Sequence, residues 1–87
     1  MSIEVVVERF IIEELLLGSD EVKLEPRQPL YTSGVLDSLA LLRLIMFLEE
    51  RYGVTIEDGQ VVPENFDSLE RIRGFVERQR GDARPAR

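Results

Sequence analysis

Residues 34–42 read Gly34-Val35-Leu36-Asp37-Ser38-Leu39-Ala40-Leu41-Leu42, and this stretch decides the fold because a glycine-containing loop gives way here to an apolar helix. Asp37 is suited to cap that helix, since its carboxylate can accept hydrogen bonds from the free amides of the first turn. The helix is predicted to run from Ser38 to Tyr52 and to end at Gly53. The Ser38 hydroxyl is therefore expected at the first turn, where it is well placed to be an attachment point.

This helix carries apolar side chains on almost every face. One stripe at helical spacing is expected to serve the core: Leu41, Leu44, Ile45 and Leu48. Three further side chains lie largely off that stripe: Leu39, Leu42 and Met46. A surface helix is normally apolar on one side only, so a second apolar face indicates an interaction surface or a sheltered cargo site. The alternative is a central helix that is buried on all sides.

Two segments precede the apolar helix. Residues 3–17 are predicted to form a first helix that stops at Gly18. Residues 18–37 form a long connection, and a connection of about twenty residues without regular structure is usually a functional or self-packed loop. Five apolar side chains can hold this loop to the body: Leu24, Leu30, Tyr31, Val35 and Leu36.

Three segments follow the apolar helix. Residues 54–56 are expected to be extended, and residues 57–65 to hold one helical turn interrupted by Gly59 and Pro63. Residues 67–80 are predicted to form the last helix, with Asp67 and Glu70 in a capping box. Its inward face is expected to be Leu69, Ile72, Phe75 and Val76.

The predicted fold class is all-α. It is a small four-helix bundle of three main helices and one short helix, with a long first loop. Residues 1–80 are expected to form this one domain. Residues 81–87 have no apolar face and are predicted to be a disordered, arginine-containing tail.

Composition excludes several classes of function. The chain of 87 residues contains no Cys and no His, so it has no thiolate metal site and lacks the usual general base near neutral pH. No carboxylate pair has a spacing that demands acid–base work, and no phosphate-cradling glycine loop is present. We therefore expect a protein that is not an enzyme and holds no metal. The absence of a secretory signal or an apolar run of membrane-spanning length predicts a soluble, cytoplasmic protein.

The net charge of −6 is unevenly distributed. Residues 1–70 carry 15 acidic and 5 basic side chains, whereas residues 71–87 carry two acidic and six basic ones. The acidic body would repel nucleic acid and favours partners with basic docking surfaces. We expect a monomer that neither binds nucleic acid nor inserts into a membrane.

The tripeptide Asp-Ser-Leu occurs twice, at residues 37–39 and 67–69. Because Asp-Ser at a helix start is ordinary capping chemistry, the tripeptide alone says little. The second copy opens a normal amphipathic helix, and Ser68 is expected to act only as a capping residue. The first copy follows a glycine-containing loop and opens the unusually apolar helix, which favours a functional role for Ser38.

In this context the chain resembles the acyl carrier protein family. Leu36-Asp37-Ser38-Leu39 matches the family's attachment motif, and Leu48-Glu49-Glu50-Arg51-Tyr52-Gly53-Val54 is similar to the family's ending of the same helix. Glu64-Asn65-Phe66-Asp67-Ser68-Leu69 resembles the segment that enters the last helix of many carriers. The resemblance covers residues 3–79.

The resemblance implies that a phosphopantetheinyl transferase, with Mg²⁺, attaches 4′-phosphopantetheine from coenzyme A to Ser38, flanked by Asp37 and Leu39. The arm would carry an acyl or aminoacyl group as a thioester. Loading by an adenylating ligase and delivery to a downstream transferase or synthase would follow. Contacts with these partners are expected from seven residues of the apolar helix: Leu39, Ala40, Leu42, Arg43, Met46, Glu49 and Glu50.

The chain departs from the family at two positions. Fatty-acid carriers commonly have acidic residues where this chain has Ala40 and Arg43. Charge at the rim of an interface sets on-rate and partner choice more than affinity, so we expect a specialised carrier rather than the housekeeping fatty acid carrier. Acyl and aminoacyl cargo both stay open. The competing hypothesis is an unmodified helical adaptor that grips a partner through the apolar helix.

Overall fold

The computed structural model describes residues 2–16 and 23–81. They form helices joined by irregular segments, and no strand occurs within these two ranges, which confirms the all-α prediction. The elements in chain order are α1 Ile3–Phe10, the π-helical turn η1 Ile11–Leu15, α2 Ser38–Tyr52, the 3₁₀ turn η2 Asp58–Gln60, α3 Pro63–Phe66 and α4 Leu69–Arg80.

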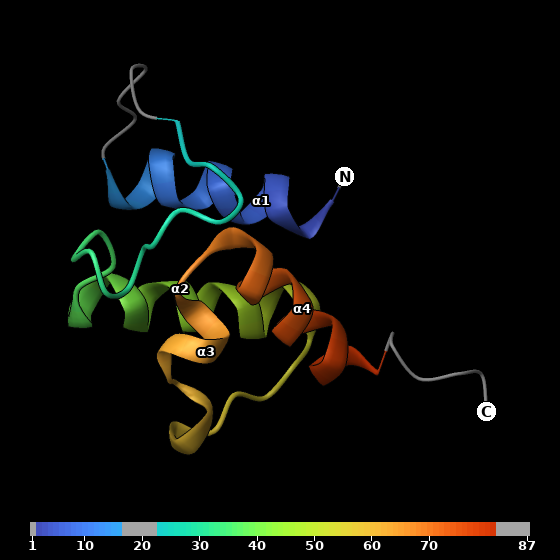
Figure 1. Cartoon of the computed structure of the whole chain (residues 1–87). Helices are drawn as coiled ribbons and strands as arrows, with labels where there is room; N and C mark the ends of the chain where they lie inside the picture. The colour runs from blue at the N-terminus through green and yellow to red at the C-terminus, as the bar shows by residue number, and fades with distance from the viewer. Residues whose placement is uncertain (1, 17–22, 82–87) are drawn as a thin grey trace.

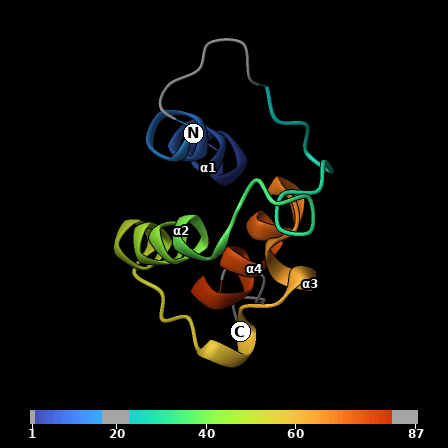
Figure 2. The same ribbon diagram turned by 90° about the vertical axis from the view of Figure 1, so that its left-hand side faces the viewer.

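The two N-terminal helices, α1 and α2, lie side by side, and the chain runs through them in opposite directions (Figures 1 and 2). Helix α4 packs against both of them, and the short α3 packs against α4. The described part of the first connection, residues 23–37, passes over the bundle and reaches the start of α2 (Figure 1). This arrangement is the predicted bundle of three main helices and one short helix.

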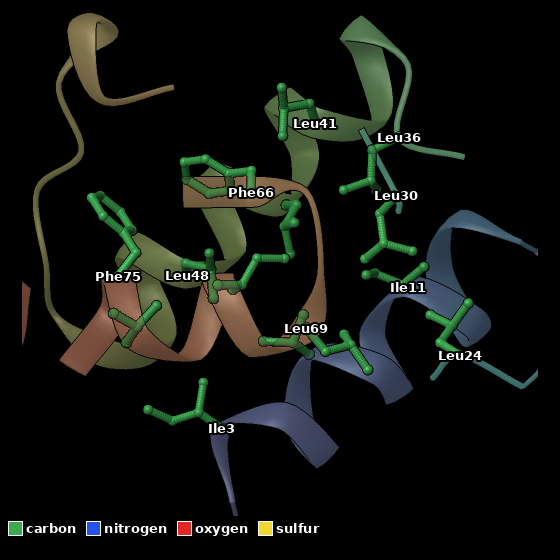
Figure 3. Packing of buried hydrophobic residues seen from close by; sticks show 14 residues of the cluster. Ile3, Ile11, Leu24, Leu30, Leu36, Leu41, Leu48, Phe66, Leu69 and Phe75 are labelled. Carbon is green, nitrogen blue, oxygen red and sulfur yellow. The ribbon is translucent and has the colours of Figure 1, made fainter. Parts of the chain in front are cut away.

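The core draws on every helix and on the first loop. Leu24, Leu30 and Leu36 are buried as predicted, and Figure 3 shows Leu30 next to Ile11, the first residue of η1. Tyr31 and Val35 are half-buried against the same cluster. Burial of apolar surface contributes about 25 cal/mol per Å², so these three leucines help to attach the loop to the bundle.

The first helix is shorter than predicted. Regular α-helix ends at Phe10, and the chain continues as a π-helical turn in which the Leu16 amide donates to the Ile11 carbonyl at 2.9 Å. The ring of Phe10 stacks on that of Phe47 in α2, with 4.2 Å between centroids. Apolar periodicity does not distinguish an α-helical from a π-helical turn over five residues. The predicted end at Leu17 and the stop at Gly18 lie outside the described residues.

Helix α2 begins and ends where the sequence predicts. Asp37 is its N-cap, and Gly53 is its C-cap in the left-handed conformation, with φ +68°. The Gly53 amide donates to the Glu49 carbonyl at 2.9 Å, which closes the last turn. Of the predicted core stripe, Leu41, Leu44 and Leu48 are buried and Ile45 is half-buried.

We expect Gly53→Ala to lower the free energy of unfolding by about 1 kcal/mol, because an L-residue is strained at positive φ. An added Cβ would meet no atom within 4 Å, so the loss comes from the backbone alone. Gly59→Ala is the matched control, since that site has equal space and no positive φ. Urea denaturation measures both variants, and equal losses would contradict the assignment.

The C-terminal third differs from the prediction in two ways. Pro63 does not interrupt a helical turn but opens α3 at its first position, where a fixed φ suits the helix and no amide is needed. The other turn, η2, contains Gly59. The last helix begins at Leu69 and its N-cap is Ser68, so the predicted capping box from Asp67 is wrong. The predicted inward residues of α4 are all buried: Leu69, Ile72, Phe75 and Val76.

Candidate functional site

The start of α2 is organised by Asp37. Its Oδ1 accepts from the Ala40 amide at 2.8 Å, and its carbonyl accepts from the Leu41 amide at 2.8 Å. The amides of Ser38 and Leu39 complete the first turn at the open end of the helix. Asp37 therefore holds Ser38 at the first helical position without using the Ser38 hydroxyl.

The two Asp-Ser-Leu copies differ in the exposure of their serines. Ser38 is exposed, and its hydroxyl makes no hydrogen bond within residues 2–16 and 23–81. Ser68 is only 4% exposed, and its Oγ accepts from the Arg71 amide at 3.1 Å. Ser68 is thus a buried capping residue, as predicted, and Ser38 is the serine that another protein can reach.

Within residues 2–16 and 23–81, Ser38 has neither a hydrogen-bonded base nor a metal-ligating cluster. The chain has no His or Cys, and within the described ranges no group of three or more acidic side chains could hold a metal ion. The nearest carboxylate in the chain, that of Asp37, is engaged with the Ala40 amide. Nothing here activates the serine as a nucleophile.

Three apolar side chains of α2 face solvent close to Ser38. Leu39 is 68% exposed, Leu42 52% and Met46 57%. They are spaced three and four residues apart, so they share one side of the helix. Their exposure confirms that they lie off the core stripe and excludes a helix buried on all sides.

Two other predicted contact residues are held by bonds within the chain. Arg43 Nη2 lies 3.9 Å from Glu14 Oε1, and Arg43 Nη1 donates to the Glu14 carbonyl at 3.4 Å, which joins α2 to the end of η1. Glu49 Oε2 accepts from the Ile56 amide at 2.9 Å and holds the chain after α2. The spacing of these residues along the sequence predicted neither the Arg43–Glu14 contacts nor the bond from the Ile56 amide to Glu49.

The remaining two predicted contact residues differ in exposure. Ala40 is half-buried, whereas Glu50 is exposed. Ala40 adds little surface for a partner beside Ser38, while Glu50 keeps its charge in water near the far end of α2.

A groove that the sequence did not indicate runs between α1 and α2. Its volume is about 300 Å³, and the stacked rings of Phe10 and Phe47 contribute to its lining with Val6, Arg9 and Arg51. The groove depends on which faces of the two helices meet. Helical periodicity predicts which face of each helix is apolar, but it does not predict which faces of two helices pack against each other.

The loop before α2 is fixed by Asp67. Its Oδ1 accepts from the amides of Leu30, Tyr31 and Thr32 at 3.2, 2.9 and 2.9 Å. These bonds, with the Thr32 amide contributing most, lower the pKa of the Asp67 carboxyl against a weaker opposing effect of burial. The sequence placed Asp67 at a helix cap, and only the fold shows that it binds a segment more than thirty residues away.

The fold and this site together define a small helical carrier domain: a bundle that presents, at the start of a capped helix, an exposed serine whose hydroxyl makes no hydrogen bond within the described residues. Comparison with known proteins supports the assignment to this class. The family described as "Phosphopantetheine attachment site" matches residues 11–76. No helix in the described ranges is long and apolar enough to cross a membrane.

The curated relatives that match this chain are named acyl carrier protein. A protein named acyl carrier protein from Solidesulfovibrio magneticus is 32% identical over 84 residues, which cover 94% of this chain and all of the relative. Acyl carrier proteins from two strains of Nitratidesulfovibrio vulgaris are each 40% identical over 58 residues, covering 67% of this chain and 74% of the relative.

The chain therefore belongs to the acyl carrier protein family of phosphopantetheine-binding domains. It is a non-catalytic carrier whose prosthetic group is 4′-phosphopantetheine, and the hypothesis of an unmodified adaptor is not supported.

The start of α2 fits such a group. A phosphodiester is an anion, and the first turn of a 15-residue helix offers amides and the positive end of the helix dipole. When bound, the arm supplies the thiol that this cysteine-free chain lacks. The exposed hydroxyl of Ser38 provides an oxygen to which the arm can be joined.

Proposed function

We propose that Ser38 is the attachment residue for 4′-phosphopantetheine. The observation that carries the proposal is the contrast between the two serines: the Ser38 hydroxyl is exposed and free of hydrogen bonds within the described ranges, whereas Ser68 is buried and caps α4. In the reaction, the Ser38 oxygen forms a bond to the phosphorus of coenzyme A that bears the pantetheine. The phosphoanhydride bond to the adenosine half breaks, adenosine 3′,5′-bisphosphate leaves with the electron pair of that bond, and the transferase accepts the hydroxyl proton.

The exposed apolar row of Leu39, Leu42 and Met46 supports a docking role for this side of α2. An enzyme that reaches Ser38 must cover the first turn of the helix, and the row extends from that turn along the helix. Exposed apolar side chains grouped on one helix face are a common form of protein recognition surface. The proposed partners are a phosphopantetheinyl transferase, a loading ligase and a downstream acyl or aminoacyl transferase or synthase.

The proposed carrier is specialised rather than a housekeeping fatty acid carrier. Ala40 is uncharged and half-buried, and Arg43 places a cation on α2 that pairs with Glu14. Such a surface would attract a basic enzyme patch less strongly than a row of acids would. The proposal therefore includes partner enzymes whose docking surfaces are less basic than those that select an acidic helix.

The test is peptide mapping after incubation of the full chain with coenzyme A, Mg²⁺ and a promiscuous phosphopantetheinyl transferase. Trypsin separates the serines, because Ser38 falls in peptide 28–43 and Ser68 in peptide 52–71. We expect one phosphopantetheine in peptide 28–43, with fragment ions that place it on Ser38 rather than Ser33. A modified peptide 52–71, or no modification of folded protein, would contradict the proposal.

A further inference from the structure

Asp67 binds the loop that leads into α2 through one carboxylate. Three consecutive amides, those of Leu30, Tyr31 and Thr32, donate to the same oxygen, Oδ1. The Thr32 hydroxyl lies 3.1 Å from Oδ2 and 3.2 Å from Oδ1, so both oxygens are used. Such charge-assisted bonds are about twice as strong as neutral ones. Asp67 therefore binds residues 30–32 of the loop to the junction between α3 and α4, and the Glu70 amide of α4 binds the earlier Pro26 carbonyl at 2.9 Å.

The bonds continue from Asp67 to the start of α2. The Leu30 amide also lies 2.8 Å from the Asp67 carbonyl, and the Leu30 carbonyl accepts from the Leu36 amide at 2.8 Å. Leu30 and Leu36 are both buried. Leu36 is followed directly by Asp37, the N-cap of α2, and then by Ser38. The position of Ser38 relative to the bundle therefore depends on the segment that Asp67 holds.

Helix α4 does not need the Asp67 side chain. Ser68 Oγ accepts from the Arg71 amide and caps the helix, while the Asp67 carboxylate makes its hydrogen bonds to residues 30–32. Asp67 and Ser68, which are neighbours in the second Asp-Ser-Leu copy, thus have separate tasks: Asp67 binds the loop and Ser68 caps α4. This separation allows the two tasks to be tested independently.

We infer that Asp67 is a positioning residue for Ser38, acting through the 30–36 segment to hold the start of α2 in the conformation that the transferase binds. The inference rests on the proposed attachment at Ser38. Without the carboxylate, the Tyr31 and Thr32 amides lose their acceptor, the Leu30 amide keeps only the Asp67 carbonyl, and the segment populates other conformations. The transferase then binds only those molecules in which the first turn of α2 has the conformation seen here. The apparent dissociation constant of the complex therefore rises by the inverse of the fraction of such molecules.

The experiment measures transferase kinetics on the full-length chain for wild type, Asp67→Ala, Asp67→Asn and Ser68→Ala, below the melting temperature of each. We expect Asp67→Ala to raise KM for the carrier about five- to tenfold, with kcat within about twofold. Asp67→Asn keeps one acceptor oxygen and should show a smaller increase. Ser68→Ala removes the neighbouring cap and should leave KM unchanged, which separates positioning from general destabilisation.

Hydrogen exchange of the backbone amides supplies a readout that needs no transferase. In Asp67→Ala, the hydrogen-bonded amides of residues 31, 32, 36, 40 and 41 are expected to exchange faster relative to the amides of α4, whereas Ser68→Ala should spare them. Unchanged exchange at residues 36, 40 and 41, or a KM equal to that of Ser68→Ala, would overturn the inference while leaving attachment at Ser38 intact. Modification of wild type at another residue would instead overturn the proposed function.

Discussion

Ser38→Ala is expected to take up no phosphopantetheine, while Ser68→Ala is expected to be modified as completely as wild type. The substitution at residue 38 removes the exposed hydroxyl at the start of α2, and no other group there can form the phosphodiester. The buried Ser68 hydroxyl is engaged with the Arg71 amide and is closed to a second protein. Intact mass after incubation with coenzyme A, Mg²⁺ and a transferase measures both outcomes.

Stability should show the opposite pattern in the same two variants. Ser68→Ala removes the N-cap of α4 and is expected to lower the free energy of unfolding by about 1 kcal/mol. Ser38→Ala leaves the cap to Asp37 and should change it by less than about 0.5 kcal/mol. Urea denaturation of the unmodified proteins measures this difference.

The two substitutions are expected to have opposite effects on modification and on stability, and this difference distinguishes loss of the attachment group from loss of structure. A folded Ser38→Ala protein that still gained one phosphopantetheine would show that attachment occurs elsewhere. Failure of both variants to be modified, with both folded, would mean that the second copy contributes to recognition by the transferase. Either result would contradict the roles assigned to the two serines.

The sequence predicts α2 well because its signals are local. Asp37 and Gly53 act on backbone groups within one turn, so a cap and a stop can be recognised from the residues beside them. The exposed apolar row follows from counting along one helix. The candidate attachment site lies within this helix, which is why its serine can be proposed from the chain alone.

The sequence predicts less where a side chain acts over a long sequence separation. Asp67 lies at a position typical of a cap, yet its carboxylate binds residues 30–32 because α3 brings the two segments together. Glu49 resembles an exposed helix acid, yet it accepts from the Ile56 amide after the chain turns back. In both cases the local pattern is compatible with two roles, and tertiary structure selects between them.

Phe66→Ala is expected to lower the free energy of unfolding by about 3–5 kcal/mol, the range for removing a buried aromatic side chain. Phe66 is fully buried, and its ring lies 5.2 Å from that of Phe75 in α4, tilted by 54°. Figure 3 shows it among the core side chains, close to Leu48 of α2. It is also the residue before Asp67, so its packing anchors the backbone from which that carboxylate binds the loop.

The matched control is Phe47→Ala, which removes the same atoms from a half-buried ring that stacks on Phe10 at the groove between α1 and α2. We expect a smaller loss of about 1–2 kcal/mol, since part of the Phe47 surface is already in water. Small domains are marginally stable, so Phe66→Ala should melt at a much lower temperature than either wild type or Phe47→Ala. Equal losses of unfolding free energy in the two variants would show that Phe66 of α3 contributes no more to stability than the half-buried Phe47. Packing of Phe66 would then not explain how the backbone at Asp67 is held.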